Sequence, residues 1–84
     1  MITIYGKNNC HWCSEAKALV ERYELKHEYK NVGYEKFSTE MFEKVPDAKT
    51  VPQVFWDDRH IGGYKELISE VENVLGANFG QELF

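Results

Sequence analysis

The sequence lacks several features, and each absence argues against a class of protein. No apolar stretch approaches the roughly 20 residues that a helix needs to cross a bilayer, which argues against a membrane protein. The 10 Lys and Arg residues are outnumbered by 14 Asp and Glu, giving a net charge of -4, so the basic surface that binds nucleic acid is missing. Met1 leads into a predicted strand without a basic, apolar leader, and we therefore expect a cytoplasmic protein.

Cysteine is scarce, since Cys10 and Cys13 are the only two in the chain. A structural zinc site needs four ligands, and His27 and His60 are far apart and unpatterned, so we expect no metal. A disulfide between residues this close constrains too small a loop to stabilise a fold by itself. In a compartment that keeps thiols reduced, such a pair is more often catalytic.

The residues that are present suffice for one folded domain. A chain of 84 residues has interior for a single core, and its 43% hydrophobic residues are dispersed along the sequence. We find no repeat, low-complexity segment or linker, so we expect a single domain over residues 1–84. We also expect the protein to be a monomer. Residues 77–84 form a C-terminal tail that either frays or covers part of the sheet.

Hydrophobic periodicity predicts the element order β-α-β-α-β-β-α. The predicted strands cover residues 2–5, 26–32 and 51–56, with a short fourth strand at Ile61 after a tight DDRH turn; the predicted helices cover 11–23, 37–45 and 65–75. This order predicts an α/β fold with four strands in a mixed sheet, three helices over it and the first strand near its centre. Asn8 and Asn9 are expected to cap the first helix.

The cysteine pair has the geometry of a reversible redox couple. Side chains three residues apart on a helix lie close enough for a disulfide. Cys10, at the helix start, faces unpaired N–H groups and the positive end of the helix dipole, which lower the pKa of a thiol. Lys7 either adds to this effect or is an ordinary surface lysine. Cys10 is therefore expected to attack a disulfide, and the more shielded Cys13 to resolve the product.

Two residues between the cysteines and two later motifs extend the candidate site. His11 either stabilises the thiolate or is merely exposed, and Trp12 either offers an aromatic face to a docked peptide or packs. In Thr50-Val51-Pro52 the proline lacks an N–H group and must open a strand or lie at an edge. Gly62-Gly63 allows close backbone approach before a helix N-terminus, a natural position for a carboxylate.

The ITIYGK strand before the C-x-x-C helix, together with TVPQVFWDDRHIGG, resembles the glutaredoxins, in particular the small bacterial and phage-type members. The likeness spans residues 1 to about 75. It implies the thioredoxin-like fold, a cis Val51–Pro52 bond, and a thiol–disulfide oxidoreductase acting in electron transport and cell redox homeostasis. It also implies glutathione as co-substrate, with no tightly bound cofactor.

The resemblance assigns glutathione's γ-glutamyl end to Gly63 and Tyr64, its cysteinyl backbone to Val51 and its glycine carboxylate to Lys7. Many glutaredoxins have an acidic residue two places after the second glycine, where this sequence has Lys65 followed by Glu66. The expected catalytic residues are Cys10 and Cys13, and the expected substrate-binding residues are Lys7, His11, Trp12, Thr50, Val51, Pro52, Gly62, Gly63 and Tyr64.

Several functions fit these residues. The first is a glutathione-dependent reductase of protein disulfides and glutathione mixed disulfides, with ribonucleotide reductase as a plausible client. The second keeps this chemistry but takes electrons from thioredoxin reductase, because Lys65 would repel the glutathione ammonium. The others are a glutathione-ligated iron–sulfur module and a peptide-docking domain with inert cysteines.

Overall fold

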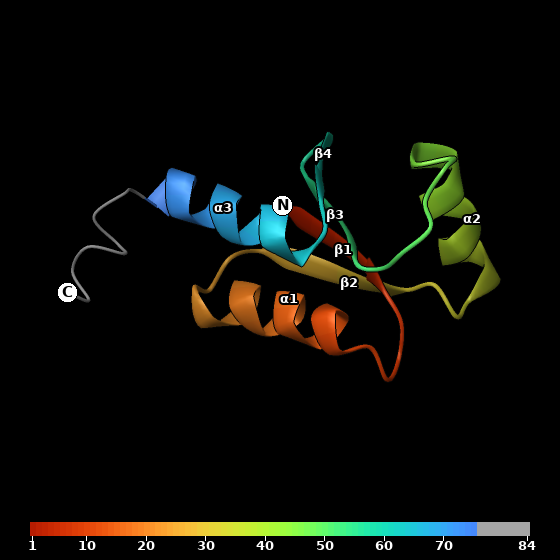
Figure 1. The fold of residues 1–84 in the computed structure, drawn as a ribbon, viewed down its shortest axis with the longest axis horizontal. Helices are drawn as coiled ribbons and strands as arrows, with labels where there is room; N and C mark the ends of the chain where they lie inside the picture. Colours follow the sequence, from red (N-terminus) through yellow and green to blue (C-terminus); the bar gives the residue numbers. More distant parts are fainter. Residues whose placement is uncertain (76–84) are drawn as a thin grey trace.

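The computed structural model describes residues 1–75, so the predicted tail lies outside the described residues. The elements are β1 (Ile2–Gly6), α1 (His11–Arg22), β2 (His27–Asn31), α2 (Glu35–Lys44), β3 (Gln53–Trp56), β4 (Arg59–Gly62) and α3 (Tyr64–Leu75). The sheet order is β2-β1-β3-β4 (Figure 1). β1 pairs parallel to β2 and antiparallel to β3, which confirms a mixed sheet with the first strand inside it.

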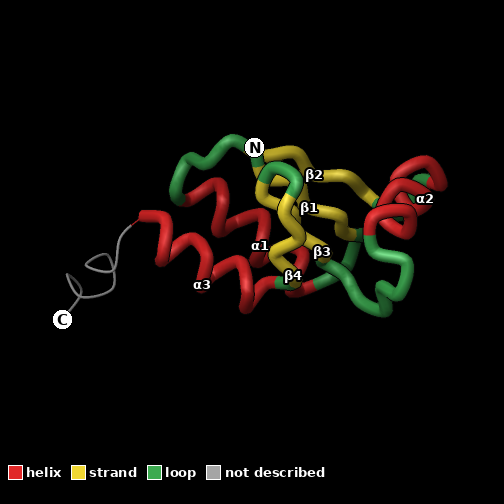
Figure 2. The backbone as a smooth tube through the Cα atoms, turned by 90° about the horizontal axis from the view of Figure 1, so that it is seen from above, coloured by secondary structure: helices red, strands yellow, loops and turns green. Residues whose placement is uncertain are grey.

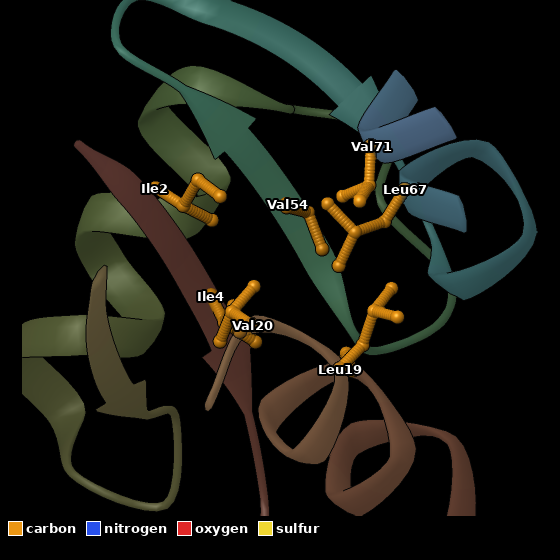
Figure 3. Close-up of a cluster of buried hydrophobic side chains, with 8 residues drawn as sticks. Ile2, Ile4, Leu19, Val20, Val54, Leu67 and Val71 are labelled. Atoms are coloured by element: carbon orange, nitrogen blue, oxygen red, sulfur yellow. The ribbon is translucent and has the colours of Figure 1, made fainter. Parts of the chain in front are cut away.

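Helices cover both faces of the sheet because strand side chains alternate between them. Ile2, Ile4 and Val54 point to the face covered by α1 and α3 and form the main apolar cluster there (Figure 3). Tyr5 and Phe55 point to the opposite face, where they pack with Met41 and Val45 from α2 and its end. α2 therefore lies apart from α1 and α3 (Figures 1 and 2).

Two predicted boundaries differ from the structure at the third and fourth strands. β3 begins at Gln53 rather than Val51, because Pro52 has no N–H to donate to the ladder. The turn of the hairpin is confined to Asp57 and Asp58, and β4 already begins at Arg59. The hairpin is thus tighter than the DDRH stretch predicted.

The cap of the first helix also differs from the prediction. Cys10 is the N-cap residue of α1, and its sulfur, not an asparagine oxygen, accepts a backbone N–H. Asn9 has a φ of 57°, in the left-handed region, and the Asn8 amide oxygen instead accepts a hydrogen bond from Asn31 on β2.

Among residues 1–75 no helix has the length and apolarity needed to span a bilayer.

Candidate active site

The two cysteines lie at the first turn of α1 and form a disulfide, with their Cα atoms 5.2 Å apart. Cys10 has an extended backbone (φ -119°, ψ 112°), while the carbonyl of Cys10 already accepts the first helical hydrogen bond, from Ser14, at 3.0 Å. The Cys13 N–H donates to the Cys10 Sγ at 3.2 Å. This N–H would stabilise a thiolate on Cys10 after reduction, since a hydrogen bond to an anion is stronger than one to a neutral sulfur.

The two sulfur-bearing residues differ in exposure. Cys13 is fully buried against the sheet, at 0% exposed, whereas Cys10 is only half-buried. An external disulfide can therefore reach Cys10 but not Cys13. The shielding of Cys13 expected from its position one turn inside the helix is confirmed.

A tyrosine that the sequence pattern did not single out supports the loop before Cys10. The Tyr29 hydroxyl on β2 donates to the Lys7 carbonyl at 3.2 Å, and burial raises the pKa of this phenol. Gly6 makes room for this contact, because a Cβ there would lie 2.3 Å from the Tyr29 oxygen and 3.1 Å from the Cys13 Cβ. Glycine at this position thus lets β2 approach the cysteine pair.

The second motif lies directly beside Cys10. The Val51–Pro52 peptide bond is cis, and the Val51 carbonyl oxygen is 3.9 Å from the Cys10 Sγ. Segments that are 41 residues apart in the sequence are thereby brought together at the reactive sulfur.

Two hollows flank the Thr50–Val51 backbone. One, of about 410 Å³, is lined by Trp12, Thr50, Val51, Pro52, Gly63, Tyr64, Lys65 and Glu66. The other, of about 300 Å³, is lined by Lys7, Val32, Ser38, Met41, Phe42, Ala48, Lys49, Thr50 and Val51. We call them the α3 groove and the α2 groove. Because they share Thr50 and Val51, an extended ligand passing Cys10 could occupy both.

An aromatic pair forms one wall of the α3 groove. The Trp12 and Tyr64 rings stack with centroids 5.3 Å apart and planes 28° from parallel, and Trp12 remains 53% exposed. His11 is exposed and lines neither groove, and its ring centroid lies 4.6 Å from that of Trp12. Trp12 therefore packs against Tyr64 and still keeps part of its ring exposed.

The end of the α3 groove is formed by the start of α3. The Gly63 N–H donates to the Glu66 carboxylate at 2.9 Å, and this backbone hydrogen bond lowers the pKa of Glu66. Gly62 has a φ of +123°, and a Cβ there would lie 3.0 Å from the Glu66 Cγ. Lys65 lines the same groove and also lowers the Glu66 pKa. Lysine and glutamate thus both face this end, and the glutamate caps the helix.

Comparison with known proteins identifies the family. A glutaredoxin family model matches residues 2–61. Glutaredoxin 1 of Escherichia coli strain K12 is 32% identical over 81 residues, which cover 88% of this chain and 95% of the bacterial protein. The chain belongs to the glutaredoxin family. Glutaredoxins are thiol–disulfide oxidoreductases, and Cys10 and Cys13 are the active-site pair of this one.

Solved glutaredoxin structures have the same fold. Crystalline glutaredoxin 1 from Francisella tularensis, complexed with cacodylate, superposes with a TM-score of 0.73 at 27% identity, covering 88% of this chain and 94% of that one. A buckwheat glutaredoxin–glutathione complex gives a TM-score of 0.70, covering 86% of this chain and 68% of that one; at 20% identity it shows the fold alone. The predicted thioredoxin-like fold is confirmed.

In this glutaredoxin most of the predicted binding residues line the two grooves that share Thr50 and Val51. The α3 groove contains Trp12, Thr50, Val51, Pro52, Gly63 and Tyr64, and the α2 groove contains Lys7. His11 and Gly62 line neither groove, and Gly62 differs from the other predicted binding residues in its positive φ. The binding roles themselves stay predictions. Within residues 1–75, no group of three or more His, Cys, Asp or Glu side chains could hold a metal ion.

Proposed function

We propose that this glutaredoxin reduces protein disulfides and glutathione mixed disulfides, with glutathione as its electron donor. The observation that carries the proposal is the half-buried Cys10 sulfur 3.9 Å from the carbonyl oxygen of Val51, a residue that lines both grooves, while Cys13 is fully buried. A cytoplasmic, monomeric protein without a bound cofactor or metal is part of the same proposal, as is ribonucleotide reductase as one client.

The reaction begins with the Cys10 thiolate. It attacks one sulfur of the client disulfide, and the client's other sulfur leaves as a thiolate that takes up a proton. Cys13 then loses its proton and attacks the Cys10 Sγ, which releases the reduced client and forms the Cys10–Cys13 disulfide. Two glutathione molecules restore the dithiol: the first forms a mixed disulfide with Cys10, and the second releases it as oxidised glutathione.

The grooves suggest how glutathione lies. Its cysteinyl backbone would pair with Val51 in the manner of an added strand, bringing its sulfur to Cys10. The γ-glutamyl carboxylate would approach Gly63 and Tyr64 in the α3 groove, and the glycine carboxylate would approach Lys7 in the α2 groove. The buckwheat complex shows that a protein of this fold binds glutathione.

A second donor has one specific observation in its favour. Lys65 lines the end of the α3 groove that the glutathione ammonium would approach, and two positive charges repel each other there. A thioredoxin reductase that reduces the Cys10–Cys13 disulfide directly would meet no such penalty. Both donors lead to the same dithiol enzyme.

The test combines trapping with a comparison of donors. We expect Cys13→Ser to accumulate a mixed disulfide on Cys10, visible by mass spectrometry as one glutathione per chain, whereas Cys10→Ser accumulates none. The oxidised wild type is then mixed with NADPH and either glutathione plus glutathione reductase or thioredoxin reductase. If NADPH were consumed only with thioredoxin reductase, that enzyme and not glutathione would be the donor. If the mixed disulfide formed on Cys13 instead of Cys10, the assigned roles of the two cysteines would be reversed.

A further inference from the structure

The side chain of Gln53 is buried immediately beside the active-site loop. It follows Pro52, begins β3 and is 9% exposed, and among the described residues it is the one polar side chain in the core. Its amide nitrogen donates to the Thr50 carbonyl at 2.9 Å. Its amide oxygen lies 2.7 Å from His60 Nε2 on β4. Both ends of the amide are therefore occupied.

These contacts fix the direction of each hydrogen bond. The Thr50 carbonyl can only accept, so the amide NH₂ of Gln53 must face it and the amide oxygen must face His60. His60 Nε2 must then carry the proton that it donates. The imidazole is also held flat against Phe55, with ring centroids 4.9 Å apart and planes 30° from parallel. A chain of hydrogen bonds thus runs from His60 through Gln53 to Thr50.

The chain ends at the backbone that separates the two grooves. Thr50 precedes Val51, whose carbonyl oxygen is 3.9 Å from the Cys10 Sγ. Residues 45–52 belong to no helix or strand, so no ladder of backbone hydrogen bonds fixes Thr50. The bond from the Gln53 side chain supplies an anchor at the end of this loop nearest the reactive sulfur.

We propose that Gln53 and His60 are positioning residues, which hold the Thr50–Val51 backbone where a substrate must lie to present its sulfur to Cys10. The inference rests on the proposed function, because it takes Val51 as the edge along which the substrate docks. Neither side chain lines either groove, and their hydrogen bonds join Gln53 to Thr50 and to His60 rather than to a cysteine sulfur. The pair therefore sets substrate affinity and leaves the intrinsic reactivity of Cys10 unchanged.

Substitutions of nearly the same shape isolate each hydrogen bond. Gln53→Glu keeps the acceptor for His60 but turns an acceptor oxygen toward the Thr50 carbonyl, so two acceptors face each other. His60→Phe keeps a ring over Phe55 and removes the donor, whereas His60→Gln restores an N–H donor of similar reach. Arg59→Gln is the matched control, since Arg59 is the neighbouring β4 residue and pairs with Glu70 rather than with the loop.

The assay is reduction of a glutathionylated peptide at pH 7. We expect KM to rise about 3- to 10-fold in Gln53→Glu and about 2- to 5-fold in His60→Phe, the range that loss of one hydrogen bond allows. We expect kcat to stay within about twofold, His60→Gln to recover most of the KM, and Arg59→Gln to match the wild type. Alkylation of Cys10 by iodoacetamide, which needs no docking, should be equal in all variants.

Two results would overturn the positioning role. One is a Gln53→Glu variant that has the unfolding midpoint of the wild type and an unchanged KM. The other is a joint fall in kcat and in Cys10 alkylation, which would place the effect on the sulfur itself. Failure of the proposed function is distinct, because the wild type would then not reduce the glutathionylated peptide; the variants would be compared on reduction of insulin disulfides, where the same KM pattern is expected.

Discussion

The hydrogen bond from the Cys13 N–H to the Cys10 sulfur can be removed while the Cys10 thiol itself is kept. Proline has no N–H, and the first turn of a helix tolerates it because the N–H groups there have no helical partner. We therefore compare Cys13→Pro with Cys13→Ala. Both leave Cys10 as the only thiol, and only the alanine variant keeps the donor that lies 3.2 Å from its sulfur.

The size of the effect follows from the strength of this bond. A hydrogen bond to a charged group contributes about 1.5–3 kcal/mol, which changes the ratio of thiolate to thiol about 10- to 150-fold. A more basic thiolate is also a better nucleophile, with a Brønsted slope of about 0.4–0.5, which offsets nearly half of this change on a logarithmic scale. In acid, where both variants are mainly protonated, we expect alkylation of Cys13→Pro to be about 3- to 15-fold slower.

The measurement is the rate of iodoacetamide alkylation across pH 4–9, with circular dichroism to establish that both variants are folded. In denaturant the two rates should become equal, because the N–H and the sulfur are no longer held together. Equal rates in the folded proteins would refute the reasoning, since they would mean that the Cys13 N–H does not stabilise the Cys10 thiolate.

Two further substitutions test the glycine and the carboxylate described above. Gly6→Ala should lower the free energy of unfolding by about 1–3 kcal/mol, because the new methyl group overlaps the Tyr29 hydroxyl, and adding Tyr29→Phe should recover part of the loss; an unchanged midpoint in urea would contradict the clash. Glu66→Gln should lower the thermal midpoint by about 2–4 °C at pH 7, since this exposed helix cap is worth only about 0.5 kcal/mol. Because the pKa of Glu66 is lowered in the folded protein, its carboxylate stabilises the fold above the ordinary pKa of glutamate, and this stabilisation is lost as the pH falls. At pH 3 the variant and the wild type should therefore unfold at the same temperature. A difference that persisted at pH 3 would exclude the charge of Glu66 as its cause.

The order of elements could be predicted because it depends on local patterns. Apolar residues spaced three and four apart marked α1, and the β-branched run at residues 2–5 marked β1. The proximity of Cys10 and Cys13 follows in the same way from helical spacing. These features need no knowledge of which segments meet in space.

The supporting contacts could not be predicted, since they depend on how the strands pair. Tyr29 reaches the Lys7 carbonyl across 22 residues, and its position depends on the parallel register of β1 and β2. Gln53 meets His60 because the hairpin pairs Phe55 with His60, and Gln53, two residues before Phe55, points to the same face of the sheet. Neither feature leaves a periodic signal in the sequence.

The predicted cap of α1 is wrong for a different reason. Asparagine is a common N-cap residue, so Asn8 and Asn9 were reasonable candidates. Cysteine is not usually counted among capping residues, yet the Cys10 sulfur fills this role. The residue that caps the helix is thus also the residue that reacts.

Because Cys13 is completely buried, Cys10 is the one sulfur of the pair that other molecules can reach. Any molecule that delivers electrons and any molecule that removes them must visit the same sulfur, from the same side, and must depart before the other arrives. The reductant and the client disulfide must therefore react with Cys10 in turn. A reductant at high concentration that stays bound next to Cys10 would slow the reaction of the client.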